Sequence, residues 1–139
     1  MPNATETFHW SESYSVHIAV LDEQHRRLIA ALNELNQALR SGMGGSVIDT
    51  VLEKLMEYST AHFDTEETLM EEHQFPGLST HRARHREFRQ KMAEFLEAHR
   101  AGKQCVPVSV MLFMEEWLKE HMLRTDQLYS AYLNARGVH

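Results

Sequence analysis

The stretch AHFDTEETLM, residues 61–70, places a histidine and a glutamate where an amphipathic helix would bury leucines. His62 and Glu66 are one helical turn apart, so their side chains share one face of the helix. Followed in steps of three and four residues, that face also carries Ile48, Leu52, Leu55, Ser59 and Leu69. This spacing is typical of the core stripe of a bundle helix. The stretch therefore predicts a helix that turns polar, metal-capable side chains into a buried core.

Three further segments of the chain carry the same stripe, and each interrupts it with histidine. Segments rich in Gly, Pro and Ser at 41–46, 75–79 and 101–107 separate them. Connections this short make successive helices antiparallel neighbours. We expect an all-α fold, an up-down-up-down antiparallel four-helix bundle with an extended N-terminal arm, which forms one domain over 1–139. The arm is 1–17, and the predicted helices lie near 18–40, 46–73, 78–100 and 107–135.

The polar positions of the four stripes converge on one level of this bundle. Each lies about 17 to 21 residues from the loop at 41–46 or the loop at 101–107, and a helix rises ~1.5 Å per residue. A single histidine on an apolar stripe is more often a hydrogen-bonded core residue than a ligand, but five at one level make that interpretation poor. A buried polar group is costly unless it is paired or binds a metal. The stripe histidines are His25, His62, His81, His85 and His121.

The donor set suits iron, with manganese as the alternative. Five imidazoles, Glu66 and one carboxylate beyond His121 exceed the four ligands of a structural zinc. Imidazole mixed with carboxylate, without cysteine, is typical of iron or manganese. A ferritin-like site would need two Glu-x-x-His motifs on the bundle helices, and the chain has that spacing only at Glu6 and His9, in the arm. Glu67 remains a rival to Glu66 at this stage, although the four-residue spacing favours Glu66.

Composition excludes several classes of protein. The net charge of −6 argues against nucleic acid as a partner, and no apolar run is long enough for membrane insertion. The N-terminus, MPNATETFHW, lacks the basic and apolar regions of a signal peptide. A single cysteine, Cys105, excludes an internal disulfide framework and fits a reducing compartment. We therefore expect a cytoplasmic protein.

With these motifs in order, the chain resembles the hemerythrin family, and specifically its single-domain bacterial members, the bacteriohemerythrins. The resemblance spans almost the whole chain. It rests on FHWSESYSVHIAVLDEQHRRL at 8–28, HFDTEE at 62–67, HRARHREF at 81–88 and WLKEHMLRTD at 117–126. Each motif alone is weak, and the four together are specific. The sequence departs from the family at His17, where glycine is common.

The resemblance implies two Fe ions in a di-iron centre with a bridging oxygen species. One iron would be bound by His81, His85 and His121, and the other by His25 and His62. Glu66 and Asp126 would bridge them. Asp126 lies five residues after His121, which is about 140° away on a regular helix. A wide turn with i,i+5 pairing would bring both to one side; otherwise Asp126 is a solvated surface acid. Candidates to orient the ligand imidazoles are Asp22, Glu23, Gln24 and Glu120.

The function that the resemblance implies is reversible O2 binding for oxygen storage, transport or delivery, and not catalysis. A dry pocket for O2 would be lined by Leu28, Phe63, Trp117, Leu118 and Met122. The alternatives are an O2 or redox sensing module, which we expect to be fused to an output domain, and a di-iron oxidase or peroxidase. A weak peroxidase-type side activity is compatible with the carrier. We expect a monomer, with an oxygen-consuming protein as a candidate partner.

Overall fold

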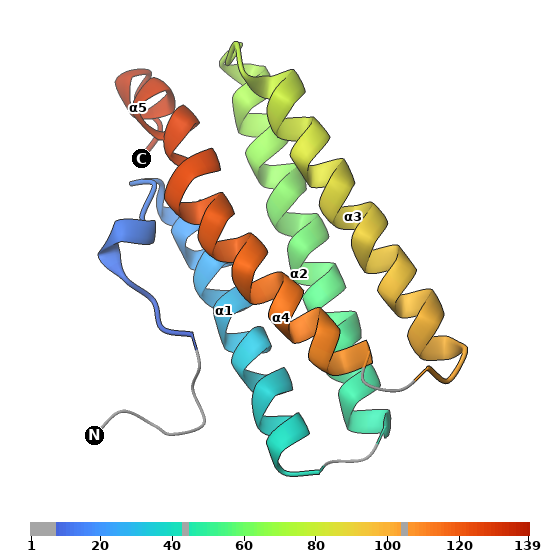
Figure 1. Ribbon diagram of the computed structural model, residues 1–139. Coiled ribbons are helices and arrows are strands. Elements are labelled where there is room, and N and C mark those ends of the chain that lie inside the picture. The colour runs from blue at the N-terminus through green and yellow to red at the C-terminus, as the bar shows by residue number, and fades with distance from the viewer. Residues whose placement is uncertain (1–7, 43–44, 104–105) are drawn as a thin grey trace.

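Four long helical rods lie antiparallel in the computed structural model, which describes residues 8–42, 45–103 and 106–139 (Figure 1). Helix α1 spans Ala19–Arg40, α2 spans Gly45–Glu72 and α3 spans Leu78–Arg100. The fourth rod consists of α4 (Val106–Glu120), the π-helical turn η2 (His121–Thr125) and α5 (Gln127–Ala135). A short 3-10 turn, η1 (Glu12–Tyr14), precedes α1. The described part of the chain contains no strand.

The predicted all-α bundle is confirmed, and its first three helices begin and end within one residue of the expected positions. The fourth helix differs, because the expected uninterrupted helix over 107–135 contains a π turn in its middle. There the backbone N–H of Asp126 donates to the carbonyl of His121, five residues earlier, at 2.7 Å. This is the wide turn that the family resemblance required if Asp126 was to lie on the same side as His121. Residues 1–7 of the predicted arm and Cys105 lie outside the described residues.

The bundle interior is divided into two apolar cores by a polar layer. The larger core includes Leu28 of α1 and Phe63 of α2, and the smaller includes Leu21 of α1 and Met70 of α2. In α1 and in α2 the polar stripe residues fall between members of the two cores. His25, for example, lies between Leu21 and Leu28. The layer of histidines and carboxylates therefore has apolar packing both above and below it.

The N-terminal arm is pinned to α1 at two points. The side chain of Asn33 accepts from the backbone N–H of Phe8 at 3.2 Å and donates to the Phe8 carbonyl at 2.8 Å. Nearer to α1, Asp22 accepts from the Ser15 hydroxyl at 2.6 Å and from the Val16 N–H at 2.9 Å. Asp22 therefore fixes the turn of the arm.

None of the described helices is both long enough and apolar enough to cross a bilayer.

His17, where the family resemblance predicted glycine, has a φ of 55°. This left-handed conformation is unfavourable for a residue with a Cβ and free of that penalty for glycine. Its backbone is held on both sides, because the N–H donates to Ser15 Oγ at 3.0 Å and the carbonyl accepts from Asn134 at 3.1 Å. The side chain is exposed. The departure from the family pattern therefore stores strain in the arm.

We predict that His17→Gly stabilises the protein by about 0.5–1 kcal/mol, because relief of the left-handed penalty exceeds the extra entropy that glycine loses. Denaturant unfolding at equal metal content measures this. His17→Ala is the control, since it removes the imidazole but keeps the Cβ, and it should give no comparable gain. If the alanine variant is stabilised as much as the glycine variant, the imidazole and not the backbone is the source of the strain.

Candidate metal centre

All seven side chains of the predicted centre meet in the polar layer, and none is more than 3% exposed. The side chains come from all four rods, so no pair of neighbouring helices could supply the full set. They form two groups, and within each group one ligand atom of every residue lies within 4.8 Å of the others. One group consists of Glu66, His81, His85 and His121, and the other consists of His25, His62, Glu66 and Asp126.

The two carboxylates lie between the groups. Glu66 directs Oε1 toward His62 and toward Nε2 of His121, at 3.2 Å from the latter, and Oε2 toward Nε2 of His81 at 2.8 Å. Asp126 directs Oδ1 toward Nε2 of His121 at 2.8 Å and Oδ2 toward Nε2 of His25 at 3.0 Å. Each carboxylate thus has an oxygen toward either group, as a ligand shared between two ions would.

The π turn explains how Asp126 reaches this position. On a regular helix a residue five positions after His121 would point about 140° away from it. The i,i+5 bond between the two residues widens the turn by one residue and returns Asp126 to the interior face. Asp126 is 0% exposed, so it is not a solvated surface acid.

Several atoms of the layer are buried without a hydrogen-bond partner in the described part of the chain. Among them are Nε2 of His25, His62 and His85 and both carboxylate oxygens of Asp126, together with Nδ1 of His25 and of His121. Unpaired buried polar atoms are rare in folded proteins and need an explanation such as a bound ion. The three Nε2 atoms and the two oxygens belong to residues of the two groups, so a pair of metal ions fits as their missing partner.

Two polar residues outside the layer orient its imidazoles. Through its Oε1 atom, Gln24 accepts a hydrogen bond from Nδ1–H of His62 at 2.8 Å, as expected for one of the four candidates. Glu67 contacts Nδ1 of His85 at 2.8 Å. Sequence reasoning weighed Glu67 only as a rival ligand and missed this second role. Of the other candidates, Asp22 holds the arm, and Glu23 and Glu120 pair with Arg27 and Arg124.

Glu67 is itself held by arginines at the surface of the bundle. Arg82 donates to its Oε1 atom at 3.1 Å, and a second arginine, Arg89, lies 3.7 Å from its Oε2 atom. A carboxylate held in this way fixes both the ring orientation and the tautomer of His85, so that Nε2 faces the layer as the free acceptor. The arrangement links a buried imidazole to the solvent-facing side of α3.

Burial and mutual attraction set the charges of the layer. Burial lowers the pKa of His62 and, to about 2, that of His85. Burial would also lower the pKa of His121, but the carboxylates of Asp126 and Glu66 raise it to about 10. Conversely, burial would raise the pKa of Glu66, while His62 and His121 hold it well below its usual range. Without metal, His121 therefore retains a proton that an arriving cation must displace.

The five residues of the predicted O2 pocket all pack on the larger core side of the layer. Leu28, Phe63, Leu118 and Met122 are at most 1% exposed, whereas Trp117 is half-buried. The indole of Trp117 stacks on His121 with ring centroids 4.3 Å apart. The five side chains thus form a continuous apolar cover, and their role in holding O2 stays a prediction.

Aromatic and phenolic groups complete the surroundings of the layer. Phe63 stacks on His85 at 3.9 Å, which buries that imidazole against an apolar ring. On the opposite, smaller core side, Tyr129 lies with its ring 5.4 Å from His81. Burial, with the nearby carboxylates of Asp126 and Glu66, raises the pKa of Tyr129 well above its usual value. Sequence reasoning missed Tyr129, although its spacing of eight residues from His121 could have suggested it.

Comparison with known proteins gives consistent matches over most of the chain. Residues 16–133 match the family model described as Hemerythrin HHE cation binding domain. The chain is 31% identical over 126 residues to a bacteriohemerythrin of Stenotrophomonas maltophilia (strain R551-3), which covers 91% of this chain and 81% of the relative. It is 27% identical to a myohemerythrin of Theromyzon tessulatum, over 92% of this chain and 95% of that one. A crystal structure of wild-type hemerythrin has a TM-score of 0.83 at 26% identity, and covers 91% of this chain and 98% of that chain.

We predict that Glu67→Gln weakens iron retention by about tenfold to a hundredfold, because His85 loses the charged partner that orients it. The rate of iron loss to a chelator measures this. Glu71→Gln is a matched control, since Glu71 also accepts from Arg82, at 3.1 Å, but is one turn further along α2 at the surface. Equal retention in the two variants would show that Glu67 does not position His85.

Proposed function

Because this chain belongs to the hemerythrin family, we propose that it binds O2 reversibly at a non-heme di-iron centre and stores, transports or delivers oxygen. The observation that carries the proposal is the pair of buried donor groups that share Glu66. A single metal would not need two groups, and a surface site would not be sealed from water. Two ions in one dry layer suit the reversible binding of O2.

The seven side chains divide unequally between the proposed irons. His81, His85 and His121 would hold one iron, His25 and His62 would hold the other, and Glu66 and Asp126 would bridge them. The two-histidine iron thus has one protein donor fewer than its neighbour. Metal sites that keep a position free of protein ligands are functional rather than structural. When bound, the iron pair supplies the electrons that hold O2 reversibly.

The contribution of the chain is to orient the donors and to keep water away. Gln24 and Glu67 fix the rings of His62 and His85, so that Nε2 of each faces the layer. On the larger core side, Leu28, Leu118 and Met122 offer only hydrocarbon and thioether surface. These three described side chains therefore have no acidic group that could give bound O2 a proton. The proposed pocket lies there.

The same arrangement argues against the enzyme alternatives. A di-iron oxidase or peroxidase would need an acid or base beside the O2 pocket. The phenol of Tyr129, a protic group beside the layer, belongs to the smaller core and not to the side of the proposed pocket. Members of the hemerythrin family are oxygen carriers rather than enzymes. A sensing module remains the second candidate function. We propose a single hemerythrin-like domain over 1–139, a monomer in the cytoplasm, that passes O2 to an oxygen-consuming protein.

The decisive experiment is an iron count combined with visible spectra of the reduced protein before and after exposure to air. We expect two irons per chain and a new absorption band that disappears when O2 is removed and returns on re-exposure. One zinc per chain, or a helical protein without metal, would contradict the centre. Consumption of peroxide by a reductant, without a reversible band, would favour the peroxidase alternative instead.

We predict that Leu118→Asn keeps the iron but shortens the lifetime of the O2-loaded protein about tenfold or more, because an amide and the water it holds would allow proton transfer to the bound ligand. The decay of the visible band after loading with O2 measures this. Leu112→Asn is the matched control, because it makes the same change on α4 at a side chain that is 58% exposed. Equal lifetimes for the two variants would remove Leu118 from the pocket.

A further inference from the structure

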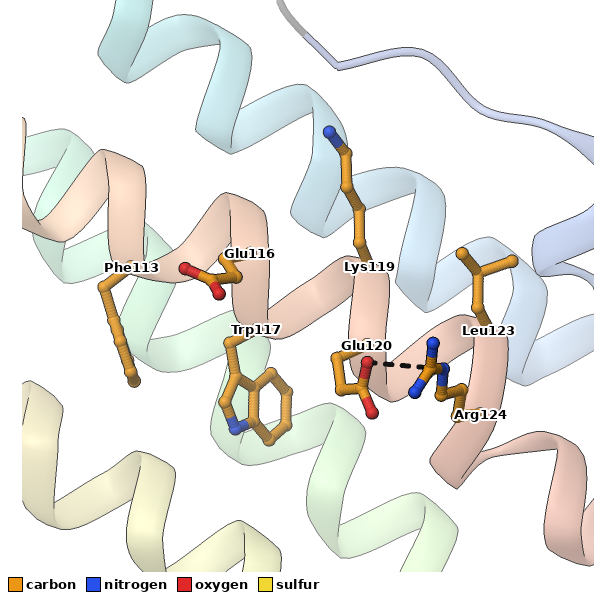
Figure 2. Close-up of a pocket in the computed structure, with 7 residues that line it drawn as sticks. All are labelled: Phe113, Glu116, Trp117, Lys119, Glu120, Leu123 and Arg124. Atoms are coloured by element: carbon orange, nitrogen blue, oxygen red, sulfur yellow. Dashed lines mark ion pairs between the residues drawn. The ribbon is translucent and has the colours of Figure 1, made fainter.

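A groove outside the bundle gives the metal layer an aromatic contact with the surface. The cavity has a volume of about 600 Å³ and runs along the outer side of α4 into η2 (Figure 2). This is within the range of small-molecule sites and far too small for a protein face. It is lined by Phe113, Glu116, Trp117, Lys119, Glu120, Leu123 and Arg124.

Trp117 connects this groove to the proposed centre. Its indole lines the cavity and stacks on the imidazole of His121 with an interplanar angle of 17°. His121 in turn places Nε2 2.8 Å from Asp126 and belongs to the three-histidine group. All seven side chains of the layer are at least 97% buried, so a reductant in solvent cannot touch them. The stacked rings give electrons a short through-space path from the groove to the layer.

We propose that the groove binds a planar, aromatic two-electron carrier of the reduced-flavin class, which returns the oxidised centre to its ferrous state through Trp117 and His121. The proposal rests on the proposed function, because a carrier whose ligand leaves with two electrons, as hydrogen peroxide, is inactive until two electrons are returned to it. A site for the reductant is then a part of the working cycle.

The lining of the groove favours an uncharged ring system. Lys119 is paired with Glu115 at 3.2 Å, and Arg124 is paired with Glu120 at 3.6 Å, the ion pair drawn in Figure 2. Of the four charged lining residues, three (Lys119, Glu120 and Arg124) are thus already matched by a neighbour of opposite sign. Phe113 and Trp117, one turn apart on α4, provide the aromatic surface against which a flat ring can pack. Leu123 provides an apolar edge that is 43% exposed.

The reaction balances with the reduced flavin as the only reductant. A reduced isoalloxazine gives up two electrons and two protons and becomes the oxidised ring. The electrons pass one at a time through the indole and the imidazole, and the two together would restore an oxidised iron pair held by the layer to its ferrous state. The protons leave the ring at the open mouth of the groove, where solvent accepts them.

The binding step is tested with riboflavin, an uncharged flavin, by equilibrium dialysis against the iron-loaded full-length chain. We expect saturable binding that Leu123→Glu weakens about tenfold, since a charge replaces the apolar edge. Leu128→Glu is the matched control, because Leu128 is 71% exposed on α5 and does not line the groove. No saturable binding, or equal binding by the two variants, would overturn the site.

The electron path is tested by mixing reduced riboflavin with the oxidised, iron-loaded protein without air. Trp117→Leu should slow reduction about tenfold or more. Trp10→Leu should leave the rate unchanged, because the second tryptophan of the chain contacts Tyr14 and Arg26 in the arm. Iron content and helicity must match wild type in both variants. Equal rates would overturn the path. A chain without iron would refute the proposed function, while the dialysis result would still decide whether the groove binds flavin.

Discussion

The burial of five imidazoles and two carboxylates in one layer is the constraint on which this structure depends. A helical backbone satisfies its own hydrogen bonds, so it offers these groups no partners inside a bundle. Several of their atoms are left unpaired among the described residues, and Glu66 remains ionised in a place without water. Such a layer is unfavourable alone and favourable around cations. Stability and metal content are therefore linked in this chain.

The two apolar cores make this layer tolerable. Their burial must offset the unfavourable free energy of burying the polar layer. They also exclude the water that would otherwise solvate the layer. The smaller core is closed by Val16 and Ile18, which follow the turn that Asp22 fixes. The arm is thus part of the seal and not an appendage. The strained backbone at His17 lies in this same turn, which shows that closing the core outweighs a local conformational penalty.

The periodicity of the sequence was sufficient for the fold and for the convergence of the layer, because both follow from helix geometry. A stripe with steps of three and four residues defines a buried face, and equal distances from the loops define a level. The π turn at Asp126 was expected only because the family motif places two ligands five residues apart, a spacing that does not fit a regular helix. The role of Glu67 was not predictable, since adjacent glutamates differ only in which helix face they occupy and in the arginines that α3 brings to them. The stack of Trp117 on His121 depends on side-chain rotamers, which periodicity does not specify.

An oxygen carrier faces opposing demands, since its centre must exclude water and protons yet remain reachable by O2 and, after oxidation, by electrons. The layer meets these demands by having different surroundings on different sides. Toward the larger core its neighbours are apolar, toward the smaller core lies the protonated Tyr129, and toward the surface of α4 lies a stacked indole. Electrons can cross an aromatic stack that a water molecule cannot pass. The use of tryptophan, rather than a polar residue, between His121 and the groove therefore separates electron access from proton access. That separation is of use to a protein that must release O2 unchanged.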